Sequence, residues 1–294
     1  MKNCPYCGSR RVARRGNYPK QRYQCTDKNH PDGTSRYFYG DTTPANVMLF
    51  DIETLPGSKY FWEMGEQDWN PDSIIKDWCV LSYTAKWLFQ PKHISDILTP
   101  KEAVAHDDKR LMKGLWDLLN RADVVIAHNA PFDVPKSNWR FIIHDMAPPS
   151  PYKIVDTLGA SRGVLKPTSR KLDWLAKQLG VGGKNHIGYQ TWVECDQGDK
   201  KALRTMLDYN ARDVYVLEDV YVKLRPWIKH PNMSLYIHSD IKVTVCPNCA
   251  SDNLSIGKDY YTDASVFTAF DCNNCGAHGR HDKKKRTSAV RVVK

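Results

Sequence analysis

The stretch Val47-Met-Leu-Phe-Asp-Ile-Glu-Thr54 decides which fold the chain can adopt. Its apolar run predicts a short buried strand over 47–52, and the strand ends in two carboxylates, Asp51 and Glu53. Successive side chains of a strand alternate between its faces, so these two acids point to the same side. Two carboxylates at the carboxyl end of a strand indicate a ligand site at the edge of a sheet.

Two further acidic motifs follow along the chain. Asn129-Ala-Pro-Phe-Asp133 comes directly after the apolar run Val124–Ala127, which predicts a buried strand. Tyr209-Asn-Ala-Arg-Asp213 lies inside a helical pattern, where its first and last residues, four apart, share a face. Four carboxylates gathered in one pocket would repel one another unless cations neutralise them. Because hard oxygen ligands with open positions select Mg²⁺ or Mn²⁺ over Zn²⁺, the motifs predict a site for two divalent ions.

Each motif alone also has a plainer interpretation. Asp-x-Glu triplets occur in many loops, Asp133 could cap a helix, and Tyr209 with Asp213 could be a surface pair on an amphipathic helix. The three motifs together are far more specific than any one of them. Two ions held in such a pocket can activate a water and stabilise the leaving oxygen of an in-line displacement, which is the chemistry that cuts a phosphodiester bond.

The remaining patterns of the central region predict an α/β domain with a mixed sheet. Strands come first and helices alternate with them later, which favours that class. Two cysteines, Cys79 and Cys195, lie outside any cysteine pair and are interpreted as ordinary core or loop residues. The patterns predict further strands over 79–88, 94–98 and 154–155, and helices over 109–119, 134–144, 172–179 and 200–224.

The three motifs give the chain a family resemblance over about residues 45–230. The runs Phe50–Thr54, Asn129–Asp133 and Tyr209–Asp213 match, in order, the three motifs of the DEDD superfamily of 3′–5′ exonucleases, the group that includes DnaQ and RNase D. The tyrosine of the third motif resembles the DEDDy subgroup, where the sister subgroup has histidine. The resemblance implies an RNase H-like fold, here a mixed five-stranded sheet with flanking helices.

The resemblance also implies a role for each motif residue. Asp51 would bridge both metal ions, Glu53 and Asp213 would hold the first, and Asp133 would hold the second through water. Tyr209 would orient the attacking water. A phenol with a pKa of about 10 is protonated near neutral pH, so it is better suited to position the water than to act as a base. By the same resemblance Asn129 would contact the terminal nucleotide. The pair Asp156-Thr157 resembles one common in the family; Asp156 could support the metal ligands, or it could simply cap a helix.

Cysteine pairs at both ends of the chain predict two zinc ribbons. The chain begins without an apolar signal region, so its nine cysteines favour metal binding over disulfides. For His30, a candidate ligand near the N-terminus, the plainer alternative is a solvated loop residue. Both ions are expected to be structural, because ribbons this small cannot fold on their apolar surface alone. The predicted ligands are Cys4, Cys7, Cys25 and His30 for one Zn²⁺, and Cys246, Cys249, Cys272 and Cys275 for the other.

The charge distribution points to a polyanionic partner. Residues 1–40 carry a net charge of +7 and residues 279–294 carry +6, which leaves −3 for the middle of a chain whose total is +10. Basic ends on either side of an acidic centre favour nucleic acid, although basic tails can also serve solubility alone. Trp62, in an aromatic segment over 56–78, could stack on an unpaired base or simply pack. A loop over 184–199 is a candidate lid. The basic candidates for substrate contact are Lys283, Lys284, Lys285 and Arg286.

The sequence therefore predicts three domains: a ribbon over 1–42, an exonuclease domain over 43–230, and a ribbon with a basic tail over 231–294. The expected substrate is single-stranded or frayed DNA, with RNA trimming as an alternative. A non-catalytic nucleic-acid adaptor and a transposase are further alternatives. The ribbons could also dock a replication or repair protein. No run of 18 apolar residues occurs, so we expect no membrane span and a cytosolic location, in a host cell if a bacteriophage encodes the protein.

Overall fold

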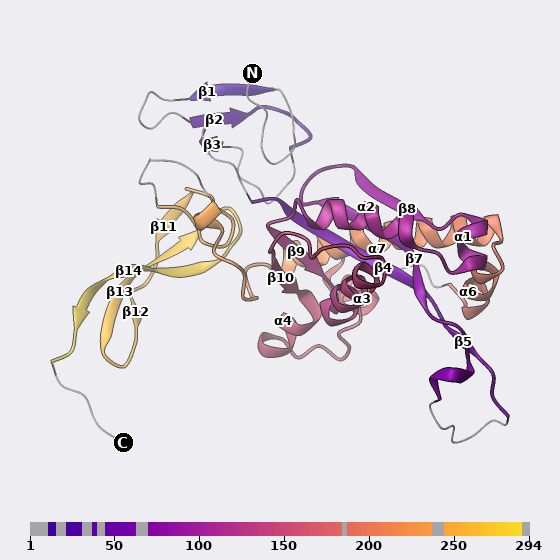
Figure 1. Cartoon of the computed structure of the whole chain (residues 1–294). Coiled ribbons are helices and arrows are strands. Elements are labelled where there is room, and N and C mark those ends of the chain that lie inside the picture. Colours follow the sequence, from indigo (N-terminus) through magenta and orange to yellow (C-terminus); the bar gives the residue numbers. More distant parts are fainter. Residues whose placement is uncertain are drawn as a thin grey trace. The chain divides into compact units, whose positions relative to one another are not determined.

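The computed structural model describes residues 11–15, 22–30, 37–39, 45–62, 70–183, 187–236 and 244–289. The chain divides into two compact units. The central unit comprises residues 46–88 and 92–221, and the terminal unit comprises residues 1–45, 89–91 and 222–294. Figure 1 shows the elements along the chain. None of the helices in the described part is both long and apolar enough to cross a membrane.

The central unit is built on a mixed five-stranded sheet. Its strands are β4 (Val47–Leu55), β7 (Cys79–Trp87), β8 (His93–Ile97), β9 (Val124–Ala127) and β10 (Lys153–Asp156). Their order is β10-β9-β4-β7-β8. The β9 strand pairs in parallel with β4 and β10, whereas β7 runs antiparallel to both β4 and β8. The mixed five-stranded sheet predicted from the sequence is confirmed.

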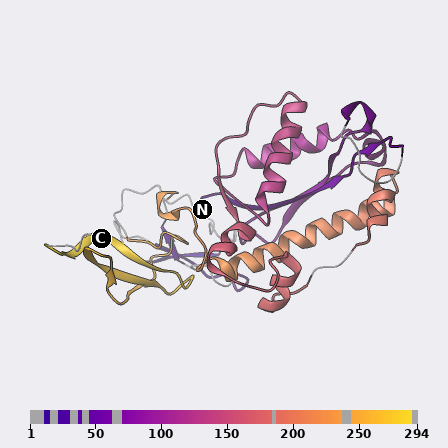
Figure 2. The same ribbon diagram turned by 90° about the horizontal axis from the view of Figure 1, so that it is seen from below.

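Three helices cover the two faces of this sheet. They are α2 (Lys109–Leu119), α3 (Ala130–Ile143) and α7 (Lys200–Leu224). Figure 2 shows α7 along one face, with α2 and α3 on the other. Because both faces are covered, the first half of the central strand β4 is apolar without alternation, and Met48, Leu49 and Phe50 have no exposed surface. Of the two interpretations of Cys79 and Cys195, core or loop, the core one holds, since both are buried.

A buried ionic cluster attaches α2 and α3 to the sheet. Asp108, which has no exposed surface, accepts hydrogen bonds from the Arg140 guanidinium at 2.7 and 2.8 Å and from the His144 imidazole at 2.5 Å. The backbone amide of Val80 on β7 donates to the same carboxylate at 2.8 Å. A buried charge is tolerated when it is paired and fully hydrogen-bonded, and breaking one such pair typically costs about 3–5 kcal/mol. The cluster therefore fixes α3 against the sheet.

Several segments differ from the sequence-based expectation. The predicted lid loop over 184–199 is wrong for residues 189–196, which form α6 (Tyr189–Asp196), because Trp192 and Cys195 pack into the core three residues apart. Two short helices, α1 (Pro100–Ala105) and α4 (Thr157–Val164), were not expected, whereas α5 (Leu172–Leu179) was. In the aromatic segment, β5 (Ser58–Lys59) pairs with β6 (Ile74–Lys76) and η1 (Pro71–Ser73) precedes β6.

The terminal unit contains two small antiparallel sheets and the short helix η2 (Met233–Tyr236). Strands β1 (Val12–Arg15), β2 (Arg22–Cys25) and β3 (Tyr37–Tyr39) form the first sheet. The second contains β11 (Leu254–Ile256), β12 (Tyr260–Tyr261), β13 (Ser265–Cys272) and β14 (His278–Thr287). In the basic segment at the C-terminal end, residues 278–287 form a strand that pairs along β13.

Candidate functional site

Strand β4 presents Asp51 and Glu53 at the point where its neighbour β9 has ended. The ladder between β4 and β9 stops at the pair Leu49 and Ile126, while the ladder to β7 continues past Glu53. The two acids lie two residues apart on the same strand, so their carboxylates share a face, and both are half-buried. The strand predicted over 47–52 extends to Leu55, so the first motif lies inside β4, on the stretch beyond its pairing with β9.

Asp133 reaches the same strand from the first turn of α3. Its Oδ1 accepts a hydrogen bond of 3.2 Å from the backbone amide of Ile52, the residue between the two acids of β4. The helix begins at Ala130 and not at residue 134 as predicted, so Asp133 lies inside the helix and Asn129 precedes it as the cap. Burial raises the pKa of the Asp133 carboxyl well above its usual range, and the negative charge of Asp51 raises it further.

Asp213 on α7 completes a group of three carboxylates. One oxygen each from Asp51, Glu53 and Asp213 lie within 4.8 Å of one another, although the last residue comes from the opposite end of the central unit's sequence. Tyr209 lies one helical turn before Asp213 and packs against the core. The structure therefore brings together three of the four predicted acids directly, and it places the fourth, Asp133, on the backbone between the first two.

Sequence reasoning missed Asn210, which contacts the site from α7. Its Nδ2 donates to the Asp51 carboxylate at 2.7 Å and also lies 3.4 Å from the Asp51 carbonyl oxygen. Asn210 has no exposed surface, and no described group donates a hydrogen bond to its Oδ1. The amide therefore holds one orientation of the Asp51 carboxylate. An asparagine on the buried side of an amphipathic helix, between Tyr209 and Asp213, was the signal that could have revealed it.

Lys136 was also missed, and it places a positive charge one turn after Asp133. Its Nζ lies 3.6 Å from the centroid of the Trp78 ring and 5.1 Å from that of Phe132. Partial burial lowers the pKa of this ammonium group. Phe132 itself is exposed and directly precedes Asp133. The spacing of four between Phe132 and Lys136 on one helix was the available signal.

Asp156 caps a helix and braces the second motif. Its Oδ1 accepts hydrogen bonds from the backbone amides of Leu158, at 3.1 Å, and Asn129, at 2.9 Å. Asn129 adopts the left-handed conformation with φ of 77°, and its side chain is exposed. Nearby, the Thr157 hydroxyl lies 2.8 Å from Nδ1 of His128. Asp156 therefore supports the loop that carries Asn129 through the backbone.

The donor set fits hard divalent cations. The acidic group offers three carboxylates in close contact, and the charges that act on the neighbouring Asp133 are themselves the carboxylates of Asp51 and Glu53. Like charges this close destabilise one another unless a cation lies among them. Carboxylate oxygens without thiolate or imidazole ligands suit Mg²⁺ or Mn²⁺.

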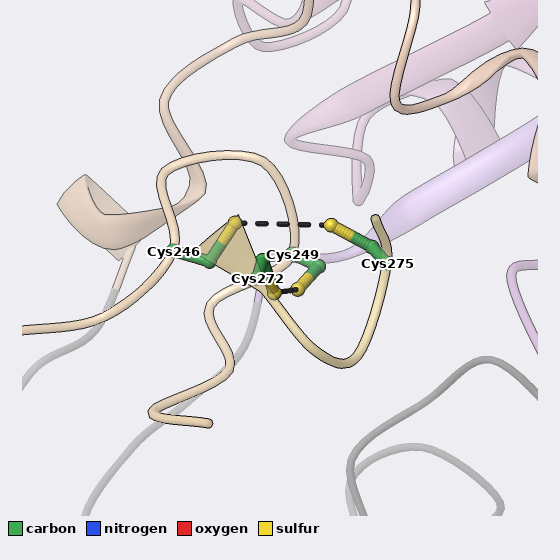
Figure 3. A group of neighbouring side chains, drawn as sticks. All are labelled: Cys246, Cys249, Cys272 and Cys275. Atoms are coloured by element: carbon green, nitrogen blue, oxygen red, sulfur yellow. Dashed lines mark hydrogen bonds between the residues drawn. The ribbon is translucent and has the colours of Figure 1, made fainter. Parts of the chain in front are cut away.

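The four C-terminal cysteines form a compact sulfur cluster (Figure 3). The sulfurs of Cys246 and Cys275 are 3.8 Å apart, and those of Cys249 and Cys272 are 3.6 Å apart. Four thiolates about 2.3 Å from a tetrahedral Zn²⁺ would lie about 3.8 Å from one another. The cluster is therefore compatible with one zinc ion.

Both knuckles of this cluster have the same backbone geometry. In the first knuckle, the amide of Ala250 donates to the Cys246 carbonyl, and the amide of Cys246 donates to the Ser251 carbonyl. In the second, the amide of Gly276 donates to the Cys272 carbonyl, and the amide of Cys272 donates to the Ala277 carbonyl. The residue after the second cysteine of each knuckle is left-handed, with φ of 61° at Ala250 and 74° at Gly276. Such turns point both cysteine sulfurs of a knuckle to one side.

The remaining predicted residues are placed as follows. Cys25, at the end of β2, and His30 are both buried, which argues against a solvated loop for this histidine. Their expected partners Cys4 and Cys7 lie outside the described residues. Trp62, three residues after the end of β5, is fully exposed. Residues 283–286, all basic, lie exposed on β14.

Comparison with known proteins supports the class of fold. Residues 98–225 match a family model described as the RNase_H superfamily. The match includes the second and third acidic motifs but begins after β4, so only the structure connects Asp51 and Glu53 to them. No curated protein matches the chain. The sheet and the match together support an RNase H-like nuclease fold, a class that uses divalent metals and binds nucleic acid.

Proposed function

We propose that the chain is a metal-dependent 3′–5′ exonuclease of the DEDDy type that acts on single-stranded or frayed 3′ ends of DNA. One observation carries the proposal: Asp51, Glu53 and Asp213, from two distant segments, place carboxylate oxygens within 4.8 Å of one another. The hydrogen bond from the Ile52 amide adds Asp133 to this group. Four acids gathered on an RNase H-like sheet match the requirement for phosphodiester hydrolysis with two metal ions.

Each residue has a proposed role. Asp51 would bridge two Mg²⁺ or Mn²⁺ ions, Glu53 and Asp213 would hold the first, and Asp133 would hold the second through water. When bound, the two ions would activate the attacking water and stabilise the leaving oxygen. Tyr209, one turn before Asp213, would orient that water.

Two residues would assist from beside the pocket. Asn210 would keep the Asp51 carboxylate in its bridging orientation, since its amide donates to that group at 2.7 Å. Lys136 would contact a substrate phosphate, because its ammonium group lies over Trp78 and Phe132 one turn after Asp133. Asn129, exposed at the start of α3, would contact the terminal nucleotide, with Asp156 fixing its backbone.

The cysteine clusters would hold structural zinc. Cys246, Cys249, Cys272 and Cys275 would bind one ion, and Cys4, Cys7, Cys25 and His30 a second. The flanking ribbons would then be folded by metal and would present basic surface to nucleic acid, as the charges at both ends of the chain indicate. Metal analysis should give about two zinc ions per chain.

The test is degradation of end-labelled single- and double-stranded DNA and RNA with Mg²⁺ or Mn²⁺. The matched proteins are the wild type, a double variant with Asp51→Ala and Glu53→Ala, and Asp208→Asn as an exposed carboxylate control on α7. We expect the wild type and the control to shorten single-stranded DNA fastest and the double variant to be inactive. Faster shortening of RNA would change the substrate class. A wild type that degrades none of these substrates, or a double variant as active as the wild type, would contradict the proposal.

A further inference from the structure

One face of the C-terminal sheet carries a row of aromatic and basic side chains across three strands. Tyr260 of β12 lies opposite Phe267 of β13, which in turn lies opposite Lys284 of β14. Residues directly opposite each other in antiparallel strands project from the same face, so these three side chains form one row. The β13–β14 register shifts on either side of the Phe267–Lys284 pair. Arg280 of β14 lies opposite Ala269, and its guanidinium lies over the Phe267 ring, which places its side chain on the same face. We name Tyr260, Phe267, Arg280 and Lys284 the ladder face.

The opposite face of the same sheet belongs to the sulfur cluster. Phe270 and Cys272 project there, and both are buried in the small core formed around the cysteines. The predicted zinc site thus uses one face to fold the sheet and leaves the ladder face for other contacts. This division gives the ladder face a rigid support although the sheet is small.

Arg280 lies over the aromatic part of the ladder face. Its Cζ is 3.8 Å from the centroid of the Phe267 ring and 5.7 Å from that of Tyr260. Phe267 is therefore covered, with 5% of its surface exposed, while Tyr260 keeps 49% exposed. Among the described residues no carboxylate pairs with Arg280, so its guanidinium is held by stacking and keeps its N–H donors available for a bound anion.

The charge of the edge strand strengthens this surface. Strand β14 contains five lysines and arginines against one acid, Asp282. In the described part of the chain, the one ion pair that involves these basic side chains joins Lys285 to Asp259 at 2.8 Å. Three other polar residues share the ladder face: Asp282, by the alternation along β14, and the pair Asp271 and His278, which lie 2.5 Å apart.

We infer that the ladder face binds single-stranded nucleic acid independently of the carboxylate group formed by Asp51, Glu53 and Asp213. Arg280 and Lys284 supply cations for the phosphates, and the half-exposed ring of Tyr260 supplies a stacking surface for an unpaired base. A duplex keeps its bases stacked inside, so it can use the cations but not the ring. This surface would retain a strand while its end is shortened, and that role rests on the proposed exonuclease function.

Point substitutions are required to test this surface, because deletion of residues 279–294 would remove the strand that completes the sheet. Binding is measured by fluorescence anisotropy of labelled oligo(dT), oligo(U) and a DNA duplex, over a range of salt concentrations. The background is Asp51→Asn without Mg²⁺ or Mn²⁺, so that no substrate is cut. The test variants are Tyr260→Ala, Arg280→Ala, Arg280→Lys and Lys284→Ala. The controls are Lys258→Ala and Ile256→Ala, exposed residues of the same ribbon.

The two kinds of contact should separate in the measurement. Loss of Tyr260 should weaken single-strand binding by about fivefold or more at every salt concentration and leave the duplex unaffected. Loss of Lys284 should lower the slope of log affinity against log salt concentration by about 0.7 for single strands. Arg280→Lys should keep that slope but lose affinity for single strands. Preference between oligo(dT) and oligo(U) then identifies which nucleic acid the ladder face retains.

Retained zinc in each variant shows that the ribbon is still folded. The inference is overturned if zinc-replete Tyr260→Ala and Lys284→Ala bind single strands like the controls. It is also overturned if the duplex binds as well as single strands do. If the ladder variants lose single-strand binding as expected but the wild type with Mg²⁺ or Mn²⁺ degrades no substrate, the proposed exonuclease is refuted and this inference stands.

Discussion

Asp213→Asn should stabilise the protein without divalent ions and abolish its stabilisation by them. The side chain is 3% exposed and lies within 4.8 Å of the Asp51 and Glu53 carboxylate oxygens. At that distance and an effective dielectric constant of about 20, two unit charges repel by about 3.5 kcal/mol. The substitution removes two of the three repulsions and keeps the shape of the side chain. Because Asp51 and Glu53 are half-buried and solvent screens them, we discount the total gain to about 2 kcal/mol.

Thermal unfolding with and without Mn²⁺ measures both effects. A gain of about 2 kcal/mol raises the melting temperature of a domain of this size by about 4–8 °C in buffer without divalent ions. In the wild type, Mn²⁺ at about 100 times its dissociation constant should add about 2.7 kcal/mol. In Asp213→Asn it should add almost nothing. No chelator is used, so that the proposed zinc ions are not removed.

The control is Asp208→Asn on the same helix, an exposed residue whose ion pair with Arg204 is 3.3 Å long. It should melt like the wild type and respond equally to Mn²⁺. The reasoning is refuted if Asp213→Asn melts below the wild type without divalent ions, or if Mn²⁺ stabilises both proteins to the same extent.

Three further predictions test separate parts of the structure. Asn210→Ala should reduce Mn²⁺ affinity by about 10–100-fold, measured by calorimetry, because the Asp51 carboxylate loses its donor; unchanged affinity would show that the amide does not matter. Cys272→Ser should release one zinc ion per chain in a colorimetric assay; full zinc content would contradict the four-cysteine site. Burial lowers the pKa of His230 to about 4, so the folded state favours neutral imidazole, and stability should fall by about 3 kcal/mol as the pH drops from 6.5 to 4. His230→Asn should remove that part of the loss in urea unfolding, whereas parallel curves for both proteins would refute it.

The sequence was most informative where a single periodic pattern extends over a whole element. The helices 109–119, 172–179 and 200–224 and the strand 124–127 have the predicted bounds, because their apolar spacing matches one face buried against the sheet or both faces covered. The acids of the site were found because each follows or lies inside such an element. That these acids lie close together in space depends on the topology of the mixed sheet, which the family resemblance implied.

Features that depend on tertiary contacts could not be predicted in this way. The early start of α3 depends on Asn129 in a left-handed conformation, held by Asp156 from the neighbouring strand. The cluster around Asp108 joins residues from two helices and a strand, so no local pattern reveals it. From its own sequence β14 resembles a charged tail, because the apolar residues that it pairs with lie on β13.

The most direct test of the central claim is the polarity of digestion. A single-stranded DNA carrying a label at its 5′ end is incubated with Mn²⁺ and sampled over time, beside the same strand labelled at its 3′ end. The proposed exonuclease should convert the first into a ladder that shortens one nucleotide at a time, and it should release the label of the second as a mononucleotide from the earliest sample. Internal fragments of the 5′-labelled strand at the earliest times, or release of mononucleotides from its 5′ end, would contradict the assignment.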